Sequence, residues 1–200
     1  RAIFYRAKNN FDHLKVALSV AVMKMVRSDR ASSGVIFTLD TESGFRDVVL
    51  VTGSYGLGEM IVQGQVDPDE FYVHKPTFRA GHRAVLRHVK GRKQDKLVFG
   101  PARSKVATRR ERVTAAKRQR YCLEDREIIE LAEQAVVIEQ HYSDVAGHPV
   151  PMDIEWAKDG IDGLLYIVQA RPETVASQKT GAIIQSFTLK EKGDVLAQGK

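Results

Sequence analysis

Hydrophobic residues recur along the chain at two spacings, and each spacing predicts a different kind of element. Short apolar runs rich in β-branched residues are typical of buried strands. They occur at 17–26, 33–39, 47–52, 71–74, 84–89 and 96–99. Residues 152–157 and 164–170 flank a turn with the sequence Asp-Gly-Ile-Asp-Gly, which predicts a β-hairpin. Pro172 is expected to end its second strand, because proline donates no hydrogen bond to a strand ladder.

A helical spacing is clearest between Asp125 and Tyr142, where the apolar residues lie three or four positions apart. They are Ile128, Leu131, Ala132, Ala135, Val136, Ile138 and Tyr142. We also expect residues 1–8 to be the end of a helix and 57–64 to be a short helix after a glycine-rich loop at 53–58. The segment 100–120 has no clear period. Mixed strands and helices predict an α+β fold.

The two strands of the predicted hairpin alternate between apolar and polar side chains, which assigns each residue to a face. The first strand is expected to direct Met152, Ile154 and Trp156 to the core, and Asp153 and Glu155 to the other face. In the return strand, one face is expected to carry Ile167, Gln169 and Arg171, and the opposite face Tyr166, Val168 and Ala170.

If the register sets Glu155 beside Gln169, one face of the hairpin presents a carboxylate, an amide oxygen and the Arg171 guanidinium. Magnesium takes hard oxygen ligands and is usually held by one or two carboxylates plus substrate phosphates. Arginine offers a fork of donors to phosphate oxygens. The set therefore suits a magnesium–nucleotide complex. On the pattern alone, an ordinary Glu–Arg cross-strand pair facing solvent is the favoured interpretation.

A second candidate is the glycine-rich sequence at 53–59, where a predicted strand leads into a predicted helix. Such loops let backbone N–H groups approach an anion. The sequence is neither a phosphate-binding P-loop nor a dinucleotide fingerprint. A tight turn followed by a favourable Glu59 at the helix start explains it equally well.

Composition narrows the class of protein. With 43% hydrophobic and 28% charged residues, the chain is typical of a soluble globular protein, and no apolar run approaches the ~20 residues of a membrane span. The single cysteine, Cys122, excludes an internal disulfide framework and fits a reducing cytoplasm. The six histidines lack metal-ligand spacing. The net charge of +6 is concentrated at 103–120, which is either a footprint for a polyanion or, as we favour, a solvated insertion.

Six segments, in order, closely resemble the phosphoenolpyruvate synthase (pyruvate,water dikinase) family. They are 26–29, 33–45, 56–64, 68–76, 151–157 and 167–175. The most specific are Pro-Met-Asp-Ile-Glu-Trp-Ala and Ile-Val-Gln-Ala-Arg-Pro-Glu-Thr-Val. The resemblance implies an ATP-grasp-like antiparallel sheet with flanking helices at 1–175. It also implies a linker and the start of a swivelling phosphohistidine domain at 176–200.

The same resemblance implies a function and a set of site residues. The family is cytoplasmic, homo-oligomeric and gluconeogenic, and it converts ATP, pyruvate and water to phosphoenolpyruvate, AMP and phosphate. The implied ligands are ATP and Mg²⁺, and no membrane or nucleic-acid partner is expected. Met25 and Val26 would contact adenine through the backbone, and Glu59 would lie near the ribose or phosphates. Glu155 and Gln169 would bind the metal, and Arg171 would hold ATP phosphates as the catalytic residue.

Several departures from the family pattern limit these expectations. Met23 stands where similar sequences have glutamine. The chain lacks an initiator Met and is expected to be a piece of a longer polypeptide, without the phosphohistidine segment or the pyruvate-binding barrel. Alone, it is expected to be inactive, and none of its histidines is the phosphohistidine. The alternatives are a pyruvate,phosphate dikinase, a rifampicin phosphotransferase, a basic nucleic-acid-binding module and a non-catalytic scaffold.

Overall fold

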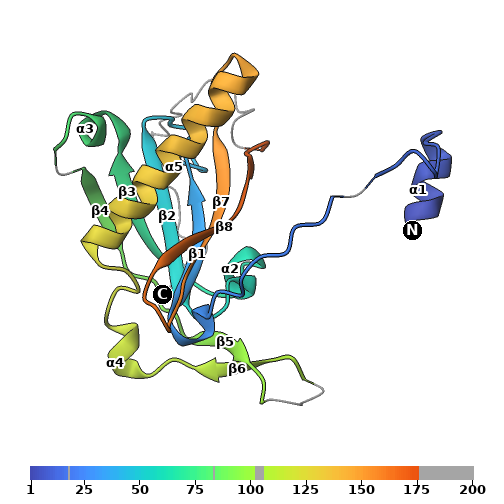
Figure 1. The fold of residues 1–200 in the computed structure, drawn as a ribbon. Coiled ribbons are helices and arrows are strands. Elements are labelled where there is room, and N and C mark those ends of the chain that lie inside the picture. The colour runs from blue at the N-terminus through green and yellow to red at the C-terminus, as the bar shows by residue number, and fades with distance from the viewer. Residues whose placement is uncertain (18, 83, 102–105, 176–200) are drawn as a thin grey trace, which may run out of the picture.

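A six-stranded antiparallel sheet forms the centre of the computed structural model, which describes residues 1–17, 19–82, 84–101 and 106–175 (Figure 1). The strand order is β4-β3-β2-β1-β7-β8. The strands are β1 (Ser32–Phe37), β2 (Val48–Tyr55), β3 (Asp69–His74), β4 (Val85–Val89), β7 (Met152–Lys158) and β8 (Leu165–Pro172). With the helices that flank this sheet, the predicted α+β, ATP-grasp-like fold is confirmed. The domain expected at 176–200 lies outside the described residues.

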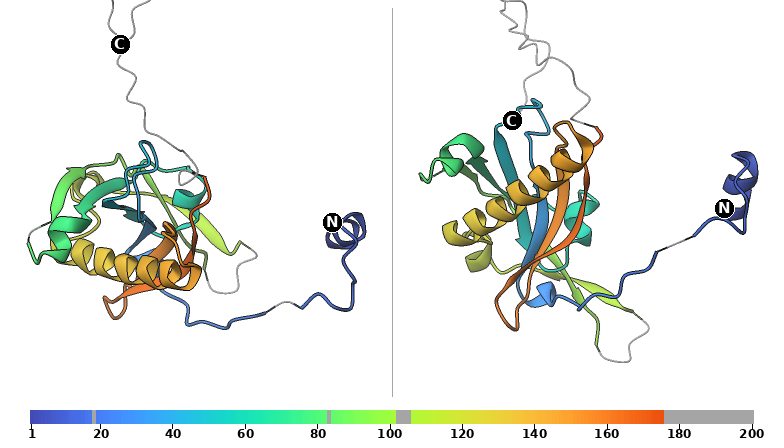
Figure 2. Two further views of the ribbon diagram at one scale, coloured as in Figure 1. Left: turned by 90° about the horizontal axis from the view of Figure 1, so that it is seen from above. Right: turned by 45° about the horizontal axis from the view of Figure 1, so that its top comes forward.

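The long helix α5 (Asp125–Ala146) covers one face of the sheet (Figures 1 and 2). It begins with a capping box, in which the side chains of Glu124 and Glu127 each accept a backbone N–H of the other residue. It ends at Gly147, whose φ of 72° is a conformation that glycine adopts without strain. The predicted helix is therefore confirmed, and it runs one turn further than its apolar stripe.

The core lies between α5 and the sheet. Ile128, Leu131, Ala132 and Ala135 are fully buried on the helix, as the stripe predicted. They pack against a layer of strand residues, namely Ile36, Val49, Val51, Phe71, Val73, Met152, Ile154 and Trp156. The sheet therefore directs one set of alternating side chains to α5 and leaves the other set on its opposite face. The short helix α2 (Glu59–Val62) lies on that second side (Figure 2).

The remaining helical elements are short. They are α1 (Ala2–Lys8), the 3₁₀ turn η1 (Ser28–Arg30), α3 (Lys75–Arg79) and α4 (Ala115–Arg118). None of the described helices combines the length and apolar character that a membrane crossing requires.

A separate two-stranded sheet pairs β5 (Asp95–Phe99) with β6 (Thr108–Arg112). The segment 100–120, which has no clear period in the sequence, contains β6 and α4. The sequence of β6, Thr-Arg-Arg-Glu-Arg, has no apolar alternation to reveal a strand. Ion pairs with β5 support it instead, joining Glu111 to Lys96 and Arg112 to Asp95, each at 3.4 Å. Within β6, Arg109 is paired with Glu111 at 2.7 Å. Part of the basic charge is thus neutralised locally.

Two predictions of secondary structure were wrong. The run 17–26 was expected to be a buried strand, but its described residues form neither helix nor strand and extend away from the sheet (Figure 1). Val22, for example, is 97% exposed, whereas Val26 at the end of the run is half-buried. The loop expected at 53–58 is reduced to 56–58, because residues 53–55 continue β2, and α2 spans only four residues. The sequence also predicts short strands at 183–189 and 195–197, which lie outside the described residues.

The buried thiol of Cys122 provides a test of the packing between the sheet and the start of α5. Burial, followed by the nearby Asp69 carboxylate, raises the pKa of this thiol well above its usual 9.0. Because the thiolate is the reactive form, we expect iodoacetamide to modify the folded chain at pH 8 about 100-fold more slowly than the urea-unfolded chain. Pulse labelling with mass spectrometry measures this. Equal rates would show that Cys122 is accessible.

Candidate functional site

The β7–β8 hairpin brings together the residues that the sequence proposed as metal ligands. Glu155 lies opposite Gln169, which is the register that the metal-site hypothesis required, and Asp153 lies opposite Arg171. On the other side of β7, Val35 of β1 lies opposite Glu155. Because Ile154 and Trp156 are buried beneath α5, Glu155 and Asp153 point to the opposite face of the sheet. That face therefore carries the candidate site.

A β-bulge in the hairpin changes the predicted faces of β8. The register shifts after Glu155, so that Trp156 pairs with Ile167 and Val168 is an extra residue. Ile167 consequently packs against the core, whereas Val168 faces the site. The prediction that Ile167 shares a face with Gln169 and Arg171 was therefore wrong, and so was the grouping of Val168 with Ala170. Perfect alternation was assumed, and a bulge breaks it.

A cavity of about 540 Å³ lies on this face, a size typical of small-molecule sites. Three separate parts of the chain supply most of its lining, at residues 23–26, 57–59 and 155–157. Four predicted site residues line it: Met25, Val26, Glu59 and Glu155. Much of the remaining lining is apolar, from Met23, Leu57, Val62, Trp156, Ala157 and Val168. The cavity thus combines apolar walls with two carboxylates.

Arg171 and Gln169 lie beside this cavity and do not line it. Arg171 lines a smaller neighbouring cavity of about 270 Å³, which shares Glu155 and Val62 with the first. Its guanidinium donates to Asp153 Oδ2 from Nε at 2.8 Å and from Nη2 at 2.6 Å. Hydrogen bonding to Asp153 is the main reason that the pKa of Arg171 is raised above its usual value. The cross-strand partner of Arg171 is therefore Asp153, whereas the simpler interpretation expected a glutamate.

The segment that carries Met25 and Val26 is anchored to the turn between β7 and β8. The backbone N–H of Arg27 donates to Asp159 Oδ2 at 3.3 Å, and the N–H of Gly160 donates to the Arg27 carbonyl at 3.1 Å. Earlier in the segment, Lys24 Nζ donates to Asp162 Oδ2 at 3.1 Å. These contacts hold the segment beside the cavity even though it lies outside the sheet.

Sequence reasoning missed these anchors, because it took the Asp-Gly-Ile-Asp-Gly sequence only as a turn. Asp162 accepts hydrogen bonds from the Leu164 N–H at 2.9 Å and from the Tyr166 hydroxyl at 2.8 Å. Together with Lys24, these donors lower the pKa of the Asp162 carboxyl, the Leu164 N–H having the largest effect. The signal available in the sequence was the presence of two aspartates in one turn, which can anchor another segment as well as form the turn.

The glycine loop forms another wall of the cavity. Gly56 has a φ of 89°, and a side chain there would collide with the Leu97 backbone, so the position requires glycine. The loop is fixed by the Leu57 N–H, which donates to the Leu97 carbonyl at 2.9 Å, and by Ser33 Oγ, which donates to the Gly56 carbonyl at 2.7 Å. Since α2 has only four residues, the helix-start contribution expected from the sequence is small.

Oxygen donors for a cation are few at this site. Across the described residues, no cluster of three or more His, Cys, Asp or Glu side chains is arranged to hold a metal ion. The paired Glu155 and Gln169 offer one carboxylate and one amide oxygen. This donor set fits a magnesium ion that shares its coordination with phosphates and water, and it does not fit an ion held by protein alone.

Comparison with known proteins adds an independent finding. Residues 1–192 match the family model described as pyruvate phosphate dikinase, AMP/ATP-binding domain. Over its whole length, the chain is 55% identical to the phosphoenolpyruvate synthase of Pseudomonas aeruginosa (strain UCBPP-PA14) and 53% identical to that of Synechocystis sp. (strain PCC 6803). It is 50% identical to the phosphoenolpyruvate synthase of Escherichia coli (strain K12). The chain spans about a quarter of the length of these relatives.

Proposed function

Because this chain belongs to the pyruvate phosphate dikinase AMP/ATP-binding domain family, we propose that its 540 Å³ cavity binds the adenosine part of ATP. The supporting observation is the lining of the cavity. Apolar side chains, including Val168 and Leu57, offer faces for a flat ring, and the anchored backbone at Met25 and Val26 offers hydrogen-bonding groups at one edge. Glu59 lies on the same lining and is available to the ribose or phosphates.

The phosphates would extend along the sheet from the cavity to Arg171. Glu155 lines both this cavity and the neighbouring one that contains Arg171, so a single extended ligand can contact both residues. The Asp153 carboxylate orients the guanidinium by accepting from Nε and Nη2. Arginine is a bidentate donor to phosphate oxygens, which suits it for neutralising charge on a transferring group.

Glu155 and Gln169 are the residues that would hold Mg²⁺ with the nucleotide. The two residues lie opposite each other on neighbouring strands, an arrangement that supports their sharing one ion. When bound, the ion supplies charge neutralisation for the phosphates. Phosphoryl transfer depends mainly on positioning and charge, and the protein contributes by fixing its ligands on rigid strands.

In the longer polypeptide, we infer the activity of a pyruvate,water dikinase. This enzyme uses ATP to phosphorylate a histidine and then pyruvate, giving phosphoenolpyruvate, AMP and phosphate. The relatives that match over the whole chain are named phosphoenolpyruvate synthase, which favours this activity over the related dikinases. The partners are ATP and the remaining domains of the polypeptide. A gluconeogenic role, a cytoplasmic location and a homo-oligomeric state belong to the same proposal.

The metal ligands are tested by replacing Glu155 and Gln169 together with alanine. We expect the affinity for ATP in the presence of Mg²⁺ to fall about 100-fold, equivalent to about 2.8 kcal/mol, because both oxygen donors are lost. Without Mg²⁺, the variant and the unmodified chain are expected to bind ATP equally. Isothermal titration calorimetry with and without EDTA measures both values.

A matched control removes the same two residue types on the other side of the sheet. Glu133→Ala with Gln134→Ala, both on α5, is expected to leave affinity unchanged. If the Glu155 and Gln169 variant keeps its Mg²⁺ dependence, the metal lies elsewhere. If the folded chain binds no ATP, either the cavity requires a further part of the polypeptide or it is not the nucleotide site. Measuring ATP binding by a chain extended upstream distinguishes the two.

A further inference from the structure

A compact basic pocket lies between the β4–β5 connection and α4, apart from the cavity assigned to the nucleotide. It has a volume of about 300 Å³, and no aspartate or glutamate lines it. Its lining is Lys90, Gly91, Arg92, Gln94, Arg118 and Gln119. Three cations and two amides therefore converge on a small space. We propose that this basic pocket binds the phosphate group of a small molecule.

The first supporting observation is the state of Arg118. Its Nε–H is buried, and it donates to no acceptor within the described residues. Buried polar groups in native proteins nearly always have a partner, and a buried donor on a charged group is costly when unpaired. Arg118 also lines the pocket, so that a turn of its guanidinium toward a bound anion would give this donor its missing acceptor.

The second observation is the local balance of charge. Lys90 Nζ is bonded to two neutral oxygens of Gln119, at 3.2 Å to Oε1 and at 3.5 Å to the carbonyl. Arg92 is paired with Asp67, from Nε to Oδ2, at 3.0 Å. Three cations and this one carboxylate leave two positive charges. A phosphate monoester carries about two negative charges at neutral pH, and arginine matches its oxygens in a bidentate fork.

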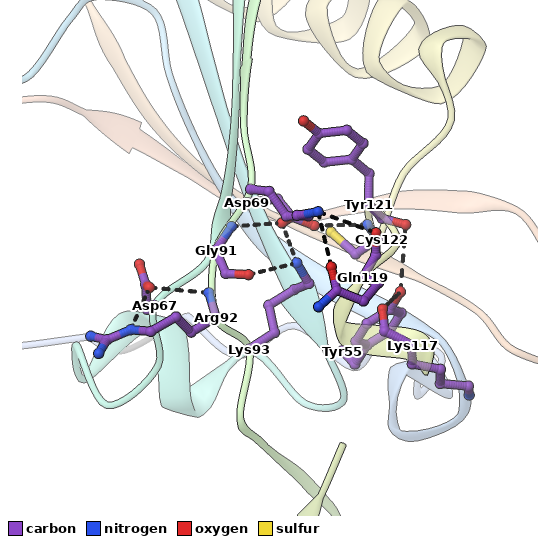
Figure 3. A network of polar contacts seen from close by, with 11 residues as sticks. Tyr55, Asp67, Asp69, Gly91, Arg92, Lys93, Lys117, Gln119, Tyr121 and Cys122 are labelled. Carbon is purple, nitrogen blue, oxygen red and sulfur yellow. Dashed lines mark hydrogen bonds and ion pairs between the residues drawn. The ribbon is translucent and has the colours of Figure 1, made fainter. Parts of the chain in front are cut away.

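The chain segments that form the pocket are joined by a buried carboxylate, that of Asp69, whose contacts Figure 3 shows. The buried Asp69 carboxylate accepts the Gly91 N–H at 2.9 Å and the Cys122 N–H at 2.8 Å, and it is paired with Lys93. One carboxylate thus joins the chain that carries Lys90 and Arg92 to the chain that follows Arg118. A preformed arrangement lowers the entropy that binding would cost.

The basic pocket gives the charged segment of the sequence a specific role. Elsewhere in that segment, Arg109 and Arg112 are tied to carboxylates of the β5–β6 sheet. Arg118 is the residue of that segment that lines the pocket, where it lies with Lys90 and Arg92. A long polyanion needs a row of phosphate contacts, so three cations gathered at one small pocket favour a single phosphate group over nucleic acid.

The pocket is tested by titrating the ¹⁵N-labelled 200-residue chain with inorganic phosphate at constant pH and ionic strength, with chloride as the balancing ion. We expect a saturable shift of the Arg118 Nε–H resonance and of the Gly91 and Arg92 amides. The resonances of residues 155–157 at the nucleotide cavity should not move. A phosphate-induced shift at this pocket does not depend on where ATP binds. The phosphate-pocket proposal and the nucleotide-cavity proposal can therefore be rejected independently of each other.

Variants make the assignment specific. Arg118→Gln is expected to weaken phosphate binding at least about tenfold, because it removes the charge and the buried donor. Arg118→Lys, which keeps the charge but loses the fork, should weaken it nearly as much. The control, Arg126→Gln on α5, removes a side chain that is 81% exposed and should change nothing. Dispersed amide spectra confirm that each variant is folded.

Two further ligands identify where the phosphate comes from. Tighter binding of glucose 6-phosphate than of inorganic phosphate would mean that the natural ligand is a phosphate ester, and equal binding would mean the free ion. A short single-stranded oligonucleotide should bind weakly. The proposal is overturned if the Arg118 Nε–H does not respond to phosphate. It is also overturned if the oligonucleotide binds more tightly and Arg109→Gln weakens that binding as much as Arg118→Gln does.

Discussion

Replacing Lys93 by methionine is expected to lower the free energy of unfolding by about 3–5 kcal/mol, because it leaves the Asp69 carboxylate buried without its counter-charge. Both side chains are 0% exposed, and they form an ion pair beneath the basic pocket. Asp69 also accepts two backbone N–H groups, from Gly91 and Cys122 (Figure 3). The pair therefore connects β3 to two loops far away in sequence, and its loss should loosen all three.

A double-mutant cycle separates the ion pair from the packing of the two side chains. Lys93→Met with Asp69→Asn removes both charges and keeps an oxygen that can accept a backbone N–H. We expect the double variant to be more stable than the sum of the single changes predicts, by about 1–3 kcal/mol. Urea denaturation followed by circular dichroism measures each stability.

The neighbouring Arg92–Asp67 pair is the control for this cycle. Its side chains are 77% and 49% exposed, so that Arg92→Met should cost less than about 1 kcal/mol. If Lys93→Met cost no more than Arg92→Met, the Asp69–Lys93 pair would be accessible to water, and the support inferred for the basic pocket would be wrong.

The elements that sequence reasoning predicted are those in which a local pattern determines the structure. The α5 stripe and the alternation in β7 each reflect one buried face. The stripe is buried from Ile128 to Ala135, half-buried at Val136 and Ile138, and exposed at Tyr142. The two strand patterns flanking the Asp-Gly-Ile-Asp-Gly turn predicted the hairpin, and the structure supplies the register that sets Glu155 opposite Gln169. Where one face is buried, a register slip would expose every core residue, so the pattern alone is informative.

What sequence reasoning missed depends on contacts between distant segments. β6 is held by ion pairs with β5 and has no apolar alternation. The bulge at Val168 is invisible in a pattern that assumes strict alternation. The Asp69–Lys93 pair and the anchor from Asp159 to Arg27 each join residues that no spacing rule connects. The run 17–26 failed in the opposite way, because its apolar composition predicted a buried strand, whereas most of its described apolar residues are exposed.

The same limit applies to the candidate site. The sequence identified Met25, Val26, Glu59 and Glu155, and the fold brings these four residues to one cavity. It did not identify Asp153 as the partner of Arg171, or Asp159 and Asp162 as anchors, because all three look like ordinary acidic residues of a hairpin. The roles of the predicted site residues as metal ligands, adenine contacts and phosphate contacts remain predictions, which the ATP-binding measurements test.

Gly34→Ala is expected to destabilise the chain by about 4 kcal/mol or more, because a methyl group has no room there. A Cβ at this position would lie 1.9 Å from the Thr52 carbonyl oxygen and 2.7 Å from Trp156 Nε1. The indole N–H donates to that same carbonyl at 3.0 Å, so alanine would intrude on this hydrogen bond. Gly34 lies opposite Gly53, and together the two glycines form the surface on which the indole lies.

The effect on Trp156 makes the prediction visible in two measurements. Trp156 is the only tryptophan in the sequence, and its indole is buried in the core against β1 and β2, so its fluorescence reports on the packing of these strands. We expect Gly34→Ala to shift the emission to longer wavelength and to lower the urea midpoint. Gly58→Ala is the matched control, since its Cβ would lie 3.5 Å from Ser33 Oγ, an ordinary contact, and its φ is −66°. An unchanged emission and midpoint in Gly34→Ala would mean that β1 and β2 can separate without cost, and the cavity wall built on them would then be softer than the hydrogen bonds indicate.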